Sequence, residues 1–523
     1  MKPHSLTAAL QNKAIYDHPV NEFELIETHC AWVLLTGDYA YKIKKPLDLG
    51  FLDFSTLEKR RHVCEEEIRL NRRLAKELYL GVVAITGSLD HPQLNGAGEV
   101  IEYAVKMQQF EHGMEFDQLI KQDKLTREHI DELATRAASF HQSLEGTAAD
   151  TAFGTIDAIR EPMLENFSQV SAILPDGIER QPLEQLQQWT TDELARLTPA
   201  LENRKQDGFI RECHGDLHLA NVTRYQNRVM LFDCLEFNPE LRWIDQISDI
   251  AFLIMDLDAH NRSDLSFRFL SAWLQQSGDY AGVPLLRLYL AYRAMVRAKV
   301  TAIQHAQHPE DGYMQQCQHY LALAASYTQR PTTSLMITHG LSGSGKSCIS
   351  QLILEQLGAI RVRSDVERKR LHGLSAKAHS KSTVGGDLYS ATSSETTYQR
   401  LATIAQAITA GGFSVIIDAT FLKQAQRQQF KTVANELGVP FVILYFHAEE
   451  NLLRQWIIER NEKGDDPSEA DISVLEHQIK TQQPLSEDEL LNTVTIDSGI
   501  YIDIPLVCKN IQHHSSQSTI GRK

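Results

Sequence analysis

The sequence has few of the features that mark secreted, metal-binding or membrane proteins. Its seven cysteines are scattered over 523 residues and form no CxxC pair. An odd, scattered set of thiols is typical of a reducing compartment rather than of a disulfide framework or a zinc site. The densest apolar run, Ile250 to Leu257, is far shorter than the ~20 residues that span a bilayer. The N-terminus also has no signal-peptide pattern. We therefore expect a cytoplasmic protein with no membrane partner.

Positive charge is also scarce. The chain has 52 Lys and Arg against 68 Asp and Glu, which gives a formal charge of −16. This balance repels phosphate backbones and argues against nucleic acid as a partner. The hydrophobic share of 42% and the charged share of 23% are those of an ordinary globular protein. At about 150 residues per domain, the length predicts three or four structural units.

The first 108 residues combine short strands with one long helix. Ala31–Leu35 and Tyr39–Lys44 flank a Thr-Gly-Asp turn and predict a hairpin. Ser55 and Glu58 form a capping box, so a helix is expected to begin there. One face of this helix is expected to carry four apolar residues: Val63, Leu70, Leu74 and Leu78.

Helical patterns dominate from 109 to 330, and apolar strands then alternate with helices. A compact β-like segment at 221–233 interrupts the helices. After a linker-like segment, the strand Leu335–Thr338 opens a βαβ alternation, which predicts a parallel sheet. The last residues are polar and are expected to be mobile. We predict four parts: an N-terminal lobe of strands and one helix at 1–108, a helical lobe at 109–330, an α/β domain at 331–508 and a mobile tail at 509–523.

A phosphate-binding loop is the strongest motif. The pattern GxxxxGK[ST] is satisfied by Gly340, Leu341, Ser342, Gly343, Ser344, Gly345, Lys346 and Ser347. It lies between a predicted strand and a predicted helix, as a P-loop does. Glycines let backbone N–H groups surround phosphate oxygens, Lys346 reaches the terminal phosphates and Ser347 is placed to ligate Mg²⁺. The motif predicts a site for ATP and Mg²⁺.

Two acidic positions accompany this loop. Asp418 ends the apolar strand Val415–Ile417, as a Walker B carboxylate does, and is expected to hold Mg²⁺. Asp365 and Arg368 form a DxxR pattern, which places a carboxylate and a guanidinium on one face of a helix.

A second set of phosphotransfer residues lies in the N-terminal half. His214, Asp216 and Asn221 form an HxDxxxxN pattern, and Asp233 follows a predicted hairpin twelve residues later. Catalytic loop, hairpin and metal-binding Asp is the order used by phosphotransferases of the protein-kinase type. Asp216 would accept the hydroxyl proton, and Asn221 and Asp233 would hold Mg²⁺.

Such a site also requires a lysine on a strand and a glutamate on the next helix. Lys42 and Lys44 lie on one face of their strand because side chains alternate. Glu67 falls within the apolar stripe of the helix, and a glutamate there demands a buried partner. Lys42 with Glu67 is the preferred pair; Lys44 and Glu66 are the alternatives.

These residues resemble those of the aminoglycoside phosphotransferase and choline kinase family. The resemblance spans about Glu22 to Leu290 and implies an α+β, bilobal protein-kinase-like fold with a small-molecule substrate. A GxGxxG loop is missing from the first strands, and Asp233 is followed by Cys-Leu where protein kinases have DFG. Asp249 resembles a structural aspartate of that family.

The C-terminal part resembles the small-molecule and polynucleotide kinase branch of the P-loop proteins, which have an α/β fold with a parallel sheet. The resemblance implies Asp365 as general base, with Arg368 and Thr420 as substrate contacts. Arg460 resembles a lid arginine that neutralises charge in the transition state. Relatives commonly have another arginine one turn earlier, where this chain has Trp456.

The whole chain resembles bacterial proteins with an aminoglycoside phosphotransferase-like domain fused to an ATP-binding P-loop domain. We predict a phosphotransferase dependent on ATP and Mg²⁺, with two nucleotide sites, that transfers the γ-phosphoryl group to a hydroxyl of a small molecule. One alternative is a regulatory P-loop ATPase with a ligand-sensing kinase-like domain. The other is a polynucleotide 5′-hydroxyl kinase, suggested by DxxR. The sequence does not identify the acceptor of either site.

Overall fold

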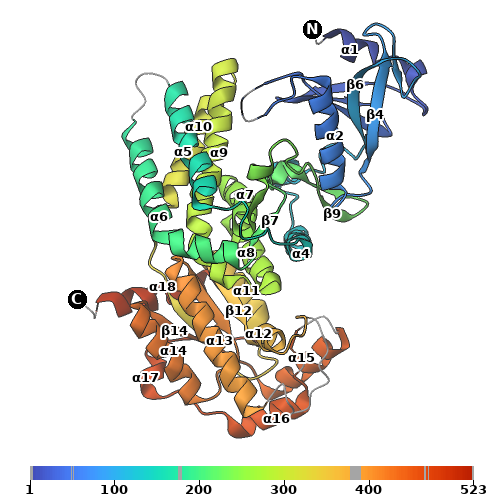
Figure 1. Cartoon of the computed structure of the whole chain (residues 1–523). Helices are drawn as coiled ribbons and strands as arrows, with labels where there is room; N and C mark the ends of the chain where they lie inside the picture. Colours follow the sequence, from blue (N-terminus) through green and yellow to red (C-terminus); the bar gives the residue numbers. More distant parts are fainter. Residues whose placement is uncertain are drawn as a thin grey trace. The chain divides into compact units, whose positions relative to one another are not determined.

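The computed structural model (Figure 1) describes residues 4–48, 50, 52–174, 180–376, 390–463, 467–468 and 470–520. The chain forms two compact units that interleave along the sequence. The first comprises Met1–Arg136, Phe140–Pro162 and Thr198–Asp256; the second comprises Ala137–Ser139, Met163–Leu197 and Leu257–Lys523. All seven cysteines are free thiols, as expected.

An antiparallel sheet forms the N-terminal part of the first unit, with the strand order β1-β2-β3-β6-β4-β5. Its elements, with the short helices that precede it, are α1 (His4–Ala9), η1 (Lys13–Ile15), β1 (Glu24–Glu27), β2 (Ala31–Leu35), β3 (Tyr39–Lys44), β4 (Tyr79–Gly87), β5 (Pro92–Leu94) and β6 (Val100–Gln108). β2 and β3 pair in antiparallel register, which confirms the predicted hairpin. The sheet places two lysines of β3 beside the helix that follows.

Helix α2 (Leu57–Asn71) packs against β4 and β6 (Figure 1). It begins one residue later than expected: Thr56 Oγ1 accepts a hydrogen bond from Lys59 N at 3.3 Å, whereas the Ser55 hydroxyl donates to Asp53. The predicted stripe is therefore shorter, because the helix ends before Leu74 and Leu78. Burial of Glu67 on this helix is as predicted.

The predicted β-like segment at 221–233 is a hairpin of β8 (Val222–Tyr225) and β9 (Arg228–Leu231). Its two loop residues, Gln226 and Asn227, both have positive φ, as a tight hairpin turn requires. The other short elements around it are β7 (Ile210–Glu212), η2 (Leu219–Asn221), η3 (Pro239–Leu241) and β10 (Trp243–Asp245). The hairpin carries the chain from Asn221 to Asp233.

Helices make up most of the remaining described residues between 109 and 330, as predicted. They are α3 (Phe116–Lys121), α4 (Arg127–Ser143), α5 (Ile156–Ile173), α6 (Gln181–Gln206), α7 (Gln246–Ala259), α8 (Ser263–Ser277), η4 (Tyr280–Leu285), α9 (Leu286–Gln307) and α10 (Tyr313–Ser326). Within the described ranges, no helix has both the length and the apolar content to cross a membrane.

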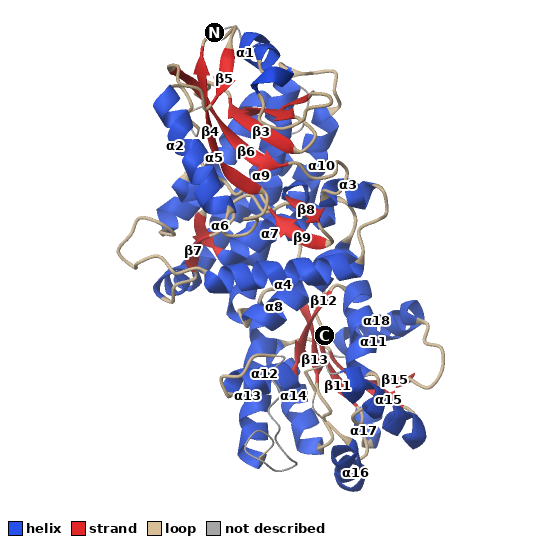
Figure 2. Cartoon of the chain, turned by 90° about the vertical axis from the view of Figure 1, so that its right-hand side faces the viewer, coloured by secondary structure: helices blue, strands red, loops and turns tan. Residues whose placement is uncertain are grey.

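A five-stranded parallel sheet lies at the centre of the C-terminal part, in the order β12-β13-β11-β14-β15. Its strands are β11 (Leu335–His339), β12 (Ala359–Arg363), β13 (Ser414–Asp418), β14 (Phe441–His447) and β15 (Thr493–Asp497). Its helices are α11 (Lys346–Leu357), α12 (Ser364–Leu371), α13 (Ala391–Ala410), α14 (Gln424–Leu437), α15 (Glu450–Lys463), α16 (Ile472–Thr481), α17 (Glu487–Leu490) and α18 (Ile504–Ile520). Figure 2 shows helices on both faces of this sheet, which is the predicted α/β arrangement.

The C-terminal residues differ from the mobile tail expected from residue 509. Helix α18 continues to Ile520, and Cys508 and Ile511 are buried in the core of the sheet. The apolar stripe of this helix begins at Ile504, so a boundary at 509 divides one amphipathic helix. Residues 521–523 of the predicted tail lie outside the described residues.

Candidate active sites

The first site centres on Lys42 of β3. Its Nζ lies 3.0 Å from Glu67 Oε1 and 2.5 Å from Asp233 Oδ1. The strand, the helix and the segment after the hairpin thus each contribute one side chain. The structure brings the preferred lysine and glutamate together beside the predicted metal-binding aspartate.

Lys44, the alternative lysine, belongs to the same cluster. Its fully buried Nζ lies 2.5 Å from Glu67 Oε2 and also bonds the carboxylate of Glu236. Glu67 therefore serves both lysines. Glu66 does not, because it pairs with Arg69 at 2.8 Å and Arg242 at 3.2 Å.

The charges of this cluster depend on one another. Burial alone would raise the pKa of Glu67, but the ammonium groups of Lys42 and Lys44 lower it to about 2. Burial would likewise lower the pKa of Lys42, but Asp233 and Glu67 raise it well above its usual value. Both groups are thus held in their charged forms. Burial raises the pKa of Glu236 despite its contact with Lys44.

The catalytic-loop residues also lie together. Asn221 Nδ2 donates to the backbone oxygen of Asp216 at 2.9 Å and to its Oδ2 at 3.2 Å. Both bonds use the amide nitrogen of Asn221. Its amide oxygen is a ligand type that suits a hard cation such as Mg²⁺. His218, which sequence reasoning did not place at the site, has its Nε2 3.4 Å from Asp216 Oδ2.

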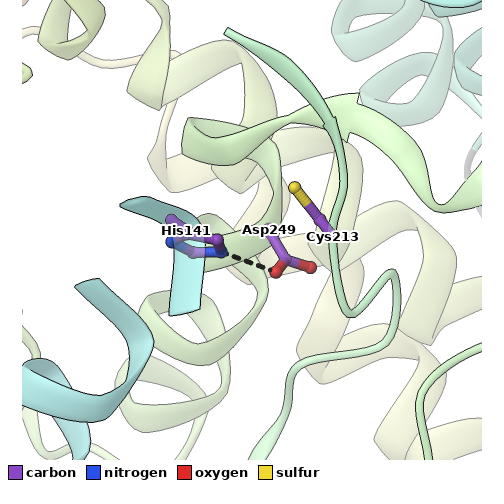
Figure 3. A group of neighbouring side chains, drawn as sticks. All are labelled: His141, Cys213 and Asp249. Atoms are coloured by element: carbon purple, nitrogen blue, oxygen red, sulfur yellow. Dashed lines mark hydrogen bonds and ion pairs between the residues drawn. The ribbon is translucent and has the colours of Figure 1, made fainter. Parts of the chain in front are cut away.

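Asp249 anchors this loop from helix α7 (Figure 3). Its Oδ2 accepts from His214 N at 3.1 Å and pairs with His141 Nε2 at 2.9 Å, and its Oδ1 accepts from Gly215 N at 2.9 Å. Cys213 completes a group whose ligand atoms lie within 4.8 Å of one another. Three hydrogen bonds to one buried carboxylate suit the scaffold role that the resemblance implies.

Asp233 is held by the N-terminal sheet and helix. Its φ is +62°, and its N–H donates to the Tyr79 hydroxyl at 3.1 Å. The next N–H, that of Cys234, donates to Asn71 Oδ1 at 2.8 Å. Tyr79 and Asn71 were not predicted, because no local pattern connects them to a loop some 160 residues away in sequence.

The P-loop forms the second site. Gly340, Gly343 and Gly345 have φ of +148°, +85° and +74°, which residues with side chains rarely adopt. Lys346 Nζ donates to the backbone oxygens of Gly340 at 3.0 Å and Leu341 at 2.6 Å. Burial lowers the pKa of Lys346 to about 8.

The first turn of α11 and the end of β13 bring the predicted magnesium ligands together. Ser347 Oγ, at the start of α11, donates to Asp418 Oδ2 at 2.7 Å. A hydroxyl beside a carboxylate is a donor set that fits Mg²⁺. Arg363, on the neighbouring strand, has its Nε 3.7 Å from the same carboxylate oxygen. It was not predicted.

A cavity of about 630 Å³ extends from this loop. The structure brings the other predicted residues to its wall: Asp365, Arg368, Thr420 and Arg460. Arg368 Nη1 lies 3.4 Å from Asp365 Oδ1, so the DxxR pair shares one face of α12 as expected. Tyr398 and Trp456 also line the cavity. Tyr398 had no motif that could have indicated it.

Two family models match the chain. Residues 53–289 match the phosphotransferase enzyme family, and residues 335–485 match an AAA domain. The chain is also 29% identical over 446 residues to uncharacterised proteins of Mycobacterium tuberculosis and Mycobacterium bovis, covering 85% of this chain and 88% of each relative.

Solved structures resemble each half. One is a choline/ethanolamine kinase family protein from Mesorhizobium loti, with 14% identity, TM-score 0.37, and coverage of 62% of this chain and 95% of that one. Another is a putative kinase from Chloroflexus aurantiacus, with 21% identity, TM-score 0.29, and coverage of 35% and 99%. The first of these family models indicates a phosphotransferase enzyme. The chain joins this phosphotransferase-like region to a region that matches an AAA domain and contains the P-loop.

Proposed function

We propose that the protein is a phosphotransferase dependent on ATP and Mg²⁺, with two nucleotide sites that each phosphorylate a hydroxyl of a small molecule. One observation carries the proposal: Lys42 meets Asp233 across 191 positions of sequence and Ser347 meets Asp418 across 71, so each half gathers candidate phosphotransfer side chains from distant segments. Such clusters stabilise charge that moves during phosphoryl transfer.

In the kinase-like site, Lys42 binds the phosphates and is oriented by Glu67. Asp216 accepts the proton of the acceptor hydroxyl, and Asn221 holds that carboxylate in place. Asn221 and Asp233 hold the magnesium ion. When bound, Mg²⁺ neutralises the developing charge on the phosphates.

In the P-loop site, backbone N–H groups and Lys346 bind the phosphates, and Ser347 and Asp418 hold the magnesium ion. Asp365 accepts the proton of the acceptor. Arg368 and Thr420 bind the acceptor, and Arg460 approaches the phosphates from α15.

Among the described residues, the cavity wall carries four cationic side chains, those of Lys346, Arg363, Arg368 and Arg460, and two carboxylates, those of Asp365 and Asp418. This positive balance suits the negative charge of a nucleotide bound with Mg²⁺. It does not select the charge of the acceptor, so the screen includes both sugar acids and amino sugars.

A screen with γ-labelled ATP tests the proposal on the full chain. The acceptors are alcohols, sugar acids, amino sugars and oligonucleotides, and the variants are Asp216→Asn and Lys346→Ala. We expect each variant to remove labelling of a different acceptor. ATP consumption without a labelled acceptor that survives Asp216→Asn but not Lys346→Ala would instead support the regulatory ATPase.

Labelled oligonucleotides would support the polynucleotide kinase. Their binding would weaken steeply with salt, because it would depend on phosphate contacts. Binding that does not respond to salt would count against that alternative.

A further inference from the structure

Helix α8 covers the open edge of the parallel sheet. β12 is an edge strand, and its Arg361 N–H donates to Ser271 Oγ of α8 at 3.3 Å. Arg268, also on α8, pairs with Glu355 of the P-loop helix at 2.6 Å. Edge strands with unpaired N–H groups favour aggregation, so this cover matters for the sheet. The helix belongs to the segment matched by the phosphotransferase family, yet it completes the P-loop part.

A side chain of α12, the helix that carries Asp365 and Arg368, binds the carboxyl end of α8. Arg370 of α12 donates from Nη2 to the backbone oxygens of Gln275 at 2.5 Å and Gln276 at 3.4 Å. Backbone oxygens at a helix end are unsatisfied within the helix and carry negative partial charge. A guanidinium is well suited to bind two of them.

A glycine makes this close approach possible. α8 is capped by Gly278 with φ +75°. A Cβ added there would lie 2.7 Å from Arg370 Nε and 2.9 Å from its Cζ, which is closer than real contacts allow. The position therefore needs glycine both for its backbone conformation and for the space that the guanidinium occupies.

Arg370 leaves α12 on the side away from the catalytic pair. At 100° per residue, its direction differs from those of Asp365 and Arg368 by roughly 140° and 160°. α12 has only 8 residues, and so short a helix depends on tertiary contacts for its position. One side of α12 thus lines the cavity while the other is bound to α8.

We propose that Arg370 is a positioning residue for the P-loop site. By binding the carboxyl end of α8, it holds α12 so that Asp365 and Arg368 face the nucleotide. Helix α8, which belongs to the segment matched by the phosphotransferase family, then helps to position the residues of the P-loop site. The catalytic consequence rests on the proposed function of Asp365 and Arg368, whereas the docking of α12 does not.

Hydrogen exchange of the full chain tests the docking. In Arg370→Ala, we expect the amides of 364–371 to exchange about tenfold faster, because hydrogen bonds to a charged group are lost. Affinity for a non-hydrolysable ATP analogue should stay within about twofold, because the P-loop backbone and Lys346 are unchanged. Arg370→Lys should restore only part of the protection, because a lysine lacks the planar fork.

Gly278→Ala gives an independent test, with Gly438→Ala as its matched control. Gly438 caps α14 at φ +69°, but a Cβ there meets nothing within 4 Å. Both substitutions impose the same backbone strain, but only Gly278→Ala displaces Arg370. We expect faster exchange of 364–371 in Gly278→Ala alone, with little further change when Arg370→Ala is added.

Three results would overturn the proposal: unchanged exchange of 364–371 in Arg370→Ala, equal effects of Gly278→Ala and Gly438→Ala, or loss of nucleotide affinity in parallel with faster exchange. For any acceptor labelled by the P-loop site, Arg370→Ala should raise the acceptor KM about tenfold and leave the ATP KM unchanged. Faster exchange in a protein that labels no acceptor would support the docking and refute the proposed function.

Discussion

The buried lysines of the two sites have different kinds of partners. Lys42 and Lys44 lie among three carboxylates, those of Glu67, Asp233 and Glu236. Lys346 bonds backbone carbonyls and the Ser344 hydroxyl. The pKa is accordingly raised for Lys42 and lowered to about 8 for Lys346.

This difference shows when each site acquires its charge balance. The lysines of the kinase-like cluster have carboxylate partners before nucleotide arrives, so phosphates must compete with carboxylates for Lys42. The P-loop lysine bonds only neutral oxygens directly, and the charges of Asp418 and Asp365 offset its burial only in part, so the triphosphate supplies the rest of its counter-charge. We expect the first arrangement to contribute more to folding and the second to contribute more to binding.

Replacing Lys44 of the kinase-like cluster and Lys346 of the P-loop should therefore have opposite effects on the stability of the folded protein. Lys44→Met leaves Glu236 without its ammonium partner, and breaking a buried ion pair costs about 3–5 kcal/mol. Lys346→Met removes a buried charge and should leave the stability of the nucleotide-free protein unchanged or slightly higher. Denaturant unfolding measures both variants. Lys45→Met, on a lysine that pairs with the exposed Glu27, is the control. Equal losses in Lys44→Met and Lys346→Met would refute the comparison.

Nucleotide affinity should show the converse. Lys346→Met is expected to weaken ATP binding at the P-loop about a hundredfold, because charge-assisted bonds to phosphate are worth about 1.5–3 kcal/mol each. Calorimetric titration in an Asp233→Asn background, which lacks a metal ligand of the kinase-like site, measures the P-loop site. A change of less than about threefold would show that the P-loop backbone alone holds the phosphates.

The anchor of the catalytic loop distinguishes the sites further. Asp249→Asn removes a charge that accepts hydrogen bonds from two backbone N–H groups, so the kinase-like site should lose about 1–3 kcal/mol of local stability. Hydrogen exchange of 213–221 is expected to rise, while exchange across the P-loop stays unchanged. Exchange that rises equally in both regions would mean that Asp249 supports the whole fold.

The smallest expected effect concerns pH. The pKa of Lys346 is lowered to about 8 in the free protein, and bound phosphates should raise it again. In the free protein, Lys346 is thus protonated below about pH 8. Above pH 8, Lys346 must take up a proton when ATP binds. ATP affinity at the P-loop should then fall up to about tenfold per pH unit above 8. Titrations from pH 7 to 9.5 measure it. A flat profile would mean that Lys346 stays protonated.

Local patterns predicted the parts of the molecule that depend on neighbouring residues. The hairpin of β2 and β3 follows from its turn, and the P-loop follows from eight consecutive residues. The contact of Lys42 with Glu67 could be predicted because a glutamate on an apolar stripe needs a buried cation. That Glu67 binds Lys44 as well followed from no such rule.

Residues that act across long sequence separations could not be predicted. His141 and Asp249 meet although 108 positions separate them, and Arg370 meets Gln275 across 95 positions. Neither pair has a spacing that a helix or strand period would reveal. The end of the chain was predicted wrongly for a different reason: its polar composition concealed the apolar stripe of α18.

The cover of β12 by α8 has a consequence for synthesis on the ribosome. Ser277 is made 86 residues before Arg363 completes the strand. At about 5–20 residues per second, this interval is roughly 4–17 s. During it, the face of α8 that carries Phe267 has no sheet to cover. The nascent chain is open to chaperones in that interval, and slower translation between these two codons would lengthen the exposure.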